Sequence, residues 1–170
     1  KNKVFCESLY LGLSDNDVEN KIAAIKSCGM TRCSQSIPII NELIIAAENN
    51  QVKLASVIAA GFISDKSSVD FLVSALDDEE ANVRWDAAVS LAKIGDKSGY
   101  GVLKNLLRRD YYTNYPQVDV KEIDNTILTV LALLSRLEDR SFKNELKVLA
   151  KDKKNIKIRE FAMKILSEYY

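Results

Sequence analysis

Residues 83–98 read VRWDAAVSLAKIGDKS, and this stretch decides the fold because the chain repeats it. Residues 52–67, VKLASVIAAGFISDKS, carry the same pattern. Its closing motif returns as residues 137–141, LEDRS, and its opening motif returns as residues 158–162, IREFA. A looser copy covers residues 14–47. Self-similarity at a period of this size predicts an array of repeats, each packed on its neighbours.

Each repeat is predicted to contain two helices. In the first, Val83, Ala87 and Leu91 follow the spacing of one helical face, whereas Trp85 and Val89 form a second apolar stripe. A helix between two neighbours in a stack needs two apolar sides, so both stripes fit an interior repeat. The chain has only 6 Gly and 2 Pro in 170 residues, which favours helices over a turn-rich β-sandwich or barrel.

Three aspartates occupy the predicted hinges between the paired helices. Asp65, Asp96 and Asp139 are each followed two residues later by a serine. Side chains of both types can accept hydrogen bonds from the free N–H groups at the start of a helix. We therefore expect these acids to be structural caps rather than catalytic groups.

The second helix of each repeat combines a constant core with a variable outer row. Leu72, Leu103 and Leu146 align in the core, while the outward positions differ from repeat to repeat. This pattern is typical of a shared scaffold that presents a different surface in each repeat. The predicted protein-binding residues lie in this outer row and in the loop after the third repeat: Asp70, Asp77, Lys104, Arg108, Tyr111, Tyr112, Tyr115, Lys147 and Lys151.

The motif has a family resemblance. Residues 77–78, DD, precede residues 83–84, VR, and these are followed by residues 87–88, AA, and residues 94–96, IGD. This combination resembles the short HEAT repeat of phycobilisome-lyase-like proteins. The likeness is strongest over residues 49–107 and looser over 125–170 and 14–47. The chain departs from the pattern in its last copy, which lacks a second helix, and in an expansion of 12 residues before the fourth repeat.

Together these observations predict an all-α fold. We expect a right-handed α-solenoid (an α-α superhelix) of about four and a half HEAT-like helix pairs in a single domain, residues 1–170. The predicted units are residues 14–47, 49–77, 79–109 and 122–151, with a half unit at 155–170 and a loop insertion at 110–121.

The insertion has two possible roles. It holds three of the seven tyrosines, Tyr111, Tyr112 and Tyr115, in a segment without helical periodicity. Loops of this length are often functional, and tyrosine offers a large contact area at low entropic cost. In the alternative interpretation, the tyrosines pack back on the helices of their own chain.

The charge distribution suggests how a partner would be oriented. The net charge is zero, yet residues 1–85 carry 8 Lys/Arg against 12 Asp/Glu, and residues 86–170 carry 16 against 12. The predicted row changes from acidic at Asp70 and Asp77 to basic at Lys147 and Lys151. A partner segment with basic residues at one end and acidic residues at the other would complement it.

The chain lacks the residues that several kinds of catalytic or metal site require. The chain has no His, which excludes imidazole bases, catalytic Ser-His or Cys-His pairs and His-ligated metals. We expect no cofactor and no metal. The odd set of Cys6, Cys28 and Cys33 argues against a disulfide framework, so we expect three small buried apolar side chains. The acids of residues 14–19 resemble a calcium loop but are explained more simply as a helix start.

The predicted function is that of a non-catalytic protein-binding scaffold or adaptor in a larger assembly, with an unidentified protein partner. The first alternative is nucleic-acid binding by the basic C-terminal half, which the pI of about 6.6 disfavours. The resemblance implies a second alternative, a lyase-like or chaperone-like partner of a pigment-bearing protein. No apolar run is long enough for a membrane span. The first residue, Lys1, indicates a piece of a longer chain, and the cytoplasm is the favoured compartment.

Overall fold

The computed structural model describes the backbone of residues 2–137 and 139–170, so Lys1 and Glu138 lie outside it. Every regular element in these ranges is a helix, and the predicted all-α class is confirmed. In chain order the elements are α1 (Asn2–Gly12), α2 (Val18–Met30), η1 (Ser34–Ser36), α3 (Ile37–Ala46), α4 (Asn50–Ile63), η2 (Lys66–Ser68), α5 (Val69–Ser74), η3 (Ala75–Asp77), α6 (Ala81–Ile94), α7 (Tyr100–Leu106), η4 (Arg109–Asn114), α8 (Val120–Leu137), η5 (Arg140–Phe142), α9 (Lys143–Leu149) and α10 (Ile156–Tyr169), where η marks a 3-10 helix.

The helices group into two compact units, Lys1–Gly99 and Tyr100–Tyr170, which we call unit 1 and unit 2. Helix α1 precedes the first repeat expected from the sequence. Residues 110–121, predicted as a loop insertion, instead hold most of the six-residue helix η4 and the first two residues of α8. The division of the array into helix-pair units and its treatment as one domain remain predictions.

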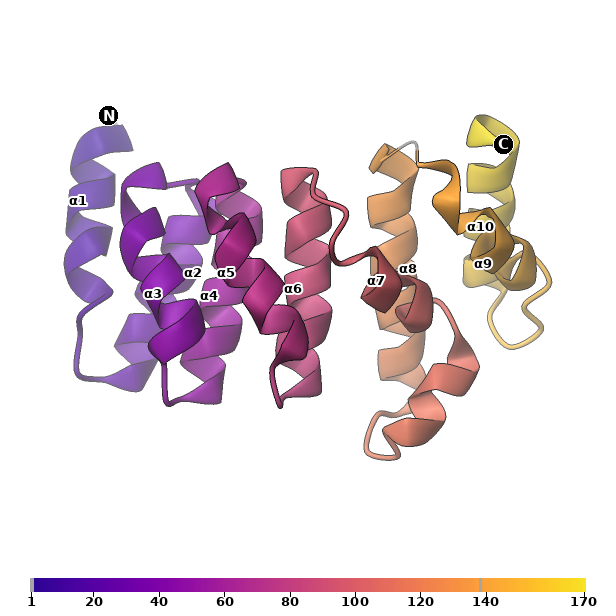
Figure 1. Ribbon diagram of the computed structural model, residues 1–170, viewed down its shortest axis with the longest axis horizontal. Helices are drawn as coiled ribbons and strands as arrows, with labels where there is room; N and C mark the ends of the chain where they lie inside the picture. Colours follow the sequence, from indigo (N-terminus) through magenta and orange to yellow (C-terminus); the bar gives the residue numbers. More distant parts are fainter. Residues whose placement is uncertain (1, 138) are drawn as a thin grey trace. The chain divides into compact units, whose positions relative to one another are not determined.

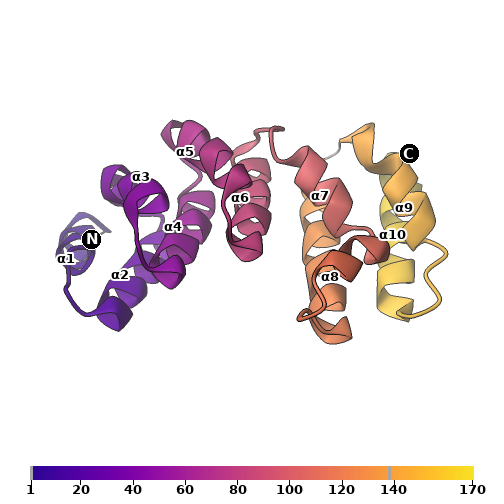
Figure 2. The ribbon, with the colours of Figure 1, turned by 60° about the horizontal axis from the view of Figure 1, so that its bottom comes forward.

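Unit 1 consists of two layers of helices. Figures 1 and 2 both show α2, α4 and α6 side by side, with α3 and α5 against them. Helix α4 contacts both α2 and α6, α3 packs on α4, and α5 packs on α6. The core between the layers is fully buried at Ile25, Ile40, Leu72 and Leu91. Helix α4 thus packs against a neighbour on each of two sides, as the two apolar stripes of an interior helix predict.

Helices α4 and α6 approach each other closely at a glycine. A Cβ added to Gly61 would lie 2.8 Å from the Cα of Ser90 on α6. The Ser90 hydroxyl donates to the carbonyl of Val57, one turn earlier on α4, at 2.9 Å. Glycine is therefore required at this position by the distance between the two helix backbones.

Gly61→Ala is expected to lower the free energy of unfolding by about 1–3 kcal/mol, because the added methyl group forces the helices apart. Glycine in a helix ordinarily costs about 0.5–1 kcal/mol relative to alanine, so the opposite sign is diagnostic. Gly101→Ala on α7 is the control, since no heavy atom lies within 4 Å of its added Cβ. Urea denaturation measures both. Equal stabilisation by the two substitutions would contradict the close approach.

Unit 2 has a separate core. Helix α8 contacts α7 and α10, and α10 also packs on α9. Leu103 and Leu106 of α7, Leu131 of α8 and Leu146 of α9 are fully buried. The Phe142 ring, also fully buried, lies 4.9 Å from that of Tyr100. The leucines that align in the repeats are therefore core residues in this unit.

The hinge aspartates accept backbone hydrogen bonds as predicted: Asp65 and Asp139 are the N-caps of η2 and η5, and Asp96 caps the turn that leads into α7. The Oδ1 atoms of Asp65, Asp96 and Asp139 accept hydrogen bonds of 2.8–2.9 Å from the backbone N–H of Ser67, Ser98 and Ser141. Hydrogen bonds from Ser67 lower the pKa of Asp65, and hydrogen bonds from Ser98 lower that of Asp96. A cap whose folded-state pKa is lowered stabilises the fold above the unfolded-state pKa. The stabilisation is lost as the pH falls through the folded-state pKa.

Asp96→Ala is expected to lower the free energy of unfolding near neutral pH by about 0.5–2 kcal/mol through loss of the cap. Asp96→Asn keeps an acceptor at the same place and should retain most of the stability. The difference between wild type and Asp96→Ala should shrink as the carboxylate is protonated in acid, which thermal melts at several pH values would show. A partner affinity that collapses in Asp96→Ala at unchanged melting temperature would contradict the structural role.

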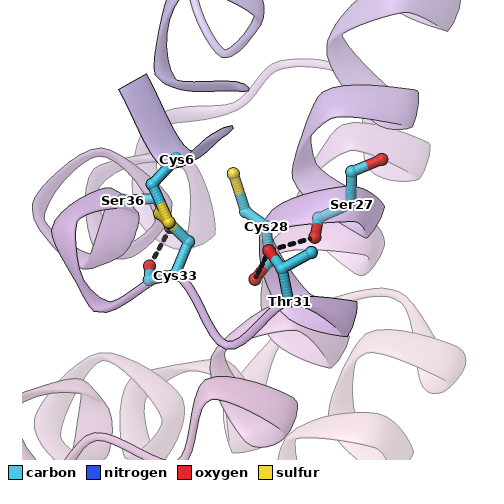
Figure 3. Close-up of a disulfide and its surroundings, with 6 residues drawn as sticks. All are labelled: Cys6, Ser27, Cys28, Thr31, Cys33 and Ser36. Atoms are coloured by element: carbon cyan, nitrogen blue, oxygen red, sulfur yellow. Dashed lines mark hydrogen bonds between the residues drawn. A yellow bond between two sulfur atoms is a disulfide. The ribbon is translucent and has the colours of Figure 1, made fainter. Parts of the chain in front are cut away.

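The expectation that all three cysteines are simple apolar residues is wrong. Cys6 of α1 and Cys33 beside η1 form a disulfide, with Cα atoms 5.8 Å apart, and Cys28 of α2 is free and buried (Figure 3). Burial raises the pKa of the Cys28 thiol. An odd number of cysteines excludes a fully paired set but allows one bond. The pairing depends on how α1 folds back toward η1, a contact that cysteine spacing does not encode.

Reduction of the disulfide is expected to destabilise unit 1 by about 2–4 kcal/mol, because it releases the closed loop between Cys6 and Cys33. Urea denaturation with and without reductant measures the effect. In Cys6→Ser the same reductant should have no effect. The disulfide predicts one reactive thiol in the denatured, non-reduced protein. Three reactive thiols would contradict it.

Candidate protein-binding surface

The outward side of α5 and η3 in unit 1 forms the first candidate surface, which we call the unit 1 face. Burial of Leu72 and Ala75 in the core places Asp70, Val73 and Asp77 on the outside, where all three are exposed. Among the described residues, neither carboxylate has an ion-pair partner. This face is acidic, as the sequence predicts.

The outward sides of α7 and α9 form the second candidate surface, the unit 2 face. Leu146 and Leu149 anchor α9 in the core, and the intervening Lys147 and Val148 are exposed. Val148 is 70% exposed, which is high for an aliphatic side chain in a stable helix. Lys151 follows just after the helix and is also exposed. Lys147 and Lys151 have no ion-pair partner in the described part of the chain.

A cleft of about 410 Å³ crosses this face between the turn after α7 and helix α9. Its apolar lining consists of the buried Leu107 and Leu149 and the exposed Val148. Its rim is polar and includes Lys151 and Glu145. Both signs of charge line the cleft, so it differs from a uniformly basic groove.

Glu145 is the unusual group in this cleft. Its Oε2 atom is buried and accepts no hydrogen bond from any described residue. A buried acceptor without a donor costs free energy unless a ligand or water supplies one. The cleft therefore has an unused acceptor beside its apolar lining.

One of the basic residues that line the cleft, Arg109, is already neutralised. The guanidinium of Arg109 makes ion pairs of 2.6 Å with Asp124 and Asp152, the first by close charge contact rather than a well-directed hydrogen bond. Burial opposes its charge, but the contacts with these carboxylates raise the pKa of Arg109. Asp152 also caps the turn into α10 by accepting from the N–H of Asn155 at 2.8 Å. Arg109 thus joins η4, α8 and the start of α10 and has a structural role.

Arg108 and Lys104 are partly engaged as well. Arg108 contacts Asp110 at 2.6 Å through an exposed ion pair, which contributes little to stability. The Lys104 ammonium lies 5.6 Å from the centre of the Phe142 ring, within range of a cation–π contact. Of the predicted basic residues, Lys147 and Lys151 are consequently the ones best placed for a partner.

The structure separates the three tyrosines of the insertion. Tyr112 is 3% exposed, and its hydroxyl donates to the Leu106 carbonyl at 2.9 Å. Tyr111 and Tyr115 are half-buried, with hydroxyls 3.1 Å apart and ring centres 5.2 Å apart. Packing against the chain's own helices therefore accounts for Tyr112, and we remove it from the candidate contacts. Tyr111 and Tyr115 keep an accessible edge.

In the described residues, no cluster of three or more metal-ligating side chains is present. None of the helices in the described ranges is both long and apolar enough to span a bilayer. Sequence reasoning placed Lys147, Val148 and Lys151 in the outer row but did not predict the cleft or the position of Glu145 in it.

Comparison with known proteins agrees with this architecture. Residues 38–114 match the family model of HEAT repeats. The fold is similar to a chain in the complex of CpcE and CpcF of phycocyanin lyase from Nostoc sp. PCC7120, with a TM-score of 0.67 and 18% sequence identity. The match covers 95% of this chain but only 65% of the other chain's length. No curated protein matches the chain in sequence.

Proposed function

We propose that this chain, whose residues 38–114 match the family model of HEAT repeats, is a non-catalytic scaffold that binds a protein partner through the outer sides of its second helices. The observation that carries the proposal is the unit 2 face. There, the exposed apolar Val148 and Lys151 line a cleft, and the exposed Lys147 lies next to Val148 on α9. Neither lysine has an ion-pair partner among the described residues. Interfaces combine an apolar centre with a polar, charged rim in this way.

A protein fits this face better than nucleic acid does. A phosphate backbone would meet Asp110, Glu145 and Asp152 in the same cleft. Arg109, which a basic-patch interpretation would use, is bound by two carboxylates of its own unit. Contacts with phosphates depend on unpaired cations, and their salt dependence reflects the number of phosphates neutralised.

A lyase-like or chaperone-like role is the second candidate. The fold similarity to the phycocyanin lyase complex favours it, since that structure holds two lyase subunits together. Such a role would also use a protein partner, here a pigment-bearing one. It predicts that a coloured protein copurifies with this chain and that its pigment content changes after incubation with it.

Affinity capture with matched variants tests the scaffold proposal. The tagged chain is used to capture and cross-link partners from cells that contain it, alongside Lys147→Glu/Lys151→Glu and Lys153→Glu/Lys154→Glu. Lys153 and Lys154 are exposed but lie outside both α9, which carries Lys147, and the cleft lining, which includes Lys151. The scaffold proposal predicts one partner that the first variant loses and the second retains, with an unchanged covalent mass. If the wild-type chain captured only nucleic acid and no protein stayed bound at high salt, nucleic-acid binding would become the favoured function.

The compartment also belongs to this proposal. Sequence composition favours the cytoplasm, where thiols are kept reduced, whereas the Cys6–Cys33 disulfide favours an oxidising compartment. We propose the oxidising one. Trapping free thiols in intact cells tests this proposal. If Cys6 and Cys33 are both reduced in the native compartment, the cytoplasm is again the favoured location.

A further inference from the structure

We propose that unit 1 binds a basic amphipathic helix of a protein partner along the unit 1 face and the outer side of the neighbouring helix α3. This inference rests on the proposed scaffold function and names the chemistry of one partner segment. It follows from carboxylates that the fold leaves unpaired, from two exposed apolar side chains among them and from the helical spacing of both.

The outer side of unit 1 carries charge of one sign. Residues 37–48 and 66–77, which hold α3 and the segment from η2 to η3, contain 4 Asp/Glu and 1 Lys/Arg. Glu42, Asp70 and Asp77 are exposed and make no hydrogen bond or ion pair with a described residue. The hinge acid Asp65, in contrast, accepts from the backbone N–H of Ser67. The fold thus uses its hinge carboxylates as caps and leaves those of the outer side available to a cationic segment.

Two exposed apolar side chains lie among these carboxylates. Ile45 of α3 is 59% exposed, and Val73 of α5 is 36% exposed. Helices α3 and α5 contact each other and lie side by side in Figures 1 and 2. Apolar contacts between charged ones are typical of a protein interface. A metal ion or a small polycation would gain nothing from Ile45 or Val73, so the apolar pair favours a protein segment.

The spacing of the unit 1 face fits a helix. Asp70, Val73 and Asp77 follow one another at intervals of three and four residues, which places them on one side of α5 and η3. The two carboxylates are seven residues apart, or about 10–12 Å along the axis. A partner helix that lies along α5 has the same period. Basic side chains at its positions i and i+7 can pair with both carboxylates while an apolar side chain between them packs on Val73.

The junction of α3 and α5 has hydrogen-bonding groups that the fold does not use. Asn41, which precedes Glu42, is 5% exposed, and its Nδ2 donates to the Ser67 carbonyl at 3.3 Å. The Oδ1 atom of Asn41 and the buried hydroxyl of Ser68 have no hydrogen-bond partner in the described part of the chain. Lysine and arginine side chains carry several donors and no acceptor. An unused amide acceptor beside unpaired carboxylates therefore favours a partner rich in such donors.

Fluorescence anisotropy with labelled helical peptides tests the inference on the full chain. The probe is an alanine-based peptide with lysine at positions i and i+7 and leucine at i+3 and i+4. One comparison probe has glutamate in place of lysine, and a second has alanine in place of leucine. A third has the composition of the probe in a scrambled order that places lysine and leucine on opposite sides.

The test variants remove the charges or the apolar contacts separately, as Asp70→Asn/Asp77→Asn and Ile45→Ser/Val73→Ser. The matched control is Glu19→Gln/Glu160→Gln, which removes the same number of negative charges at exposed positions of α2 and α10. Circular dichroism and urea denaturation check that each variant is folded.

The basic leucine peptide should bind wild type and the control equally. Its binding should be about fivefold or more weaker to Asp70→Asn/Asp77→Asn and about tenfold or more weaker to Ile45→Ser/Val73→Ser. Added salt should weaken binding to wild type more than to Asp70→Asn/Asp77→Asn, because the screened ion pairs are absent from the variant. The three comparison probes should bind wild type weakly.

Equal losses in Asp70→Asn/Asp77→Asn and in the control would overturn the inference, because binding would then follow net charge rather than this surface. Equal binding of the scrambled peptide would overturn it as well. If the basic peptide does not bind while a captured cellular partner is still lost in Lys147→Glu/Lys151→Glu, this inference fails and the scaffold proposal survives. If that partner binds both lysine double variants equally, the surface proposed for the scaffold fails, whatever the peptide does.

Discussion

Tyr112→Ala should lower the free energy of unfolding by about 3–5 kcal/mol, the range for truncating a fully packed aromatic side chain. The Tyr112 ring is 3% exposed within unit 2, and its hydroxyl donates to the Leu106 carbonyl at 2.9 Å. Its ring centre lies 5.6 Å from that of Tyr111 in an edge-on contact. Burial raises the pKa of Tyr112, in line with a hydroxyl kept away from water.

Urea denaturation of wild type, Tyr112→Ala and Tyr112→Phe separates the contributions of ring and hydroxyl. Tyr112→Phe keeps the ring and should cost about 0.5–1.5 kcal/mol, mainly through loss of the hydrogen bond. The expectation from sequence alone, that Tyr112 anchors a partner, makes the opposite prediction. A Tyr112→Ala protein of normal stability with faster partner dissociation would restore that role.

The second large effect is expected at Leu103, where truncation to alanine should cost about 2–5 kcal/mol. Leu103 is fully buried on α7, a helix of seven residues that has few other anchors in the core of unit 2. Its loss should reduce hydrogen-exchange protection in α7 and in the contacting helix α8.

Val148→Ala is the matched control, because the side chain is aliphatic but 70% exposed, and its stability effect should stay within about 0.5 kcal/mol. A Leu103→Ala loss below about 1 kcal/mol would mean that α7 presents a different side to the core. The register of the unit 2 face would then have to be reassigned.

The helical architecture could be predicted because it depends on short-range patterns. Leu72, Leu103 and Leu146 recur at the same place in the repeat, and all three are fully buried. Asp65 and Asp96 cap through the N–H two residues later, so spacing along the chain was sufficient to predict the contact. Periodicity and capping are local properties, and a repeat presents them several times.

The features that the sequence did not predict depend on contacts between distant segments. Cys6 and Cys33 are 27 residues apart and pair only because α1 lies against η1. Arg109 reaches Asp152 over 43 residues. Its neighbour Arg108, of identical chemistry, remains exposed. Sequence composition does not distinguish Arg108 from Arg109, because only the packing of the folded chain brings one of them to a carboxylate of a distant segment.

The candidate site was predictable in part for the same reason. The outward register of Lys147 and Lys151 follows from the repeat. The cleft depends on how the turn at Arg108 to Asp110 approaches α9, and the turn belongs to an insertion without a repeat counterpart. The unused acceptor of Glu145 is likewise a property of the folded unit and has no sequence signal.

The most direct test of the scaffold account is hydrogen exchange of the chain with and without its captured partner, combined with the intact mass of that partner. The account predicts new protection in α7, α9 and the turn between Arg108 and Asp110, and no change in the partner's covalent mass. Protection confined to α2, α4, α8 or α10, or a covalently altered partner, would contradict a scaffold that binds through the outer sides of its second helices.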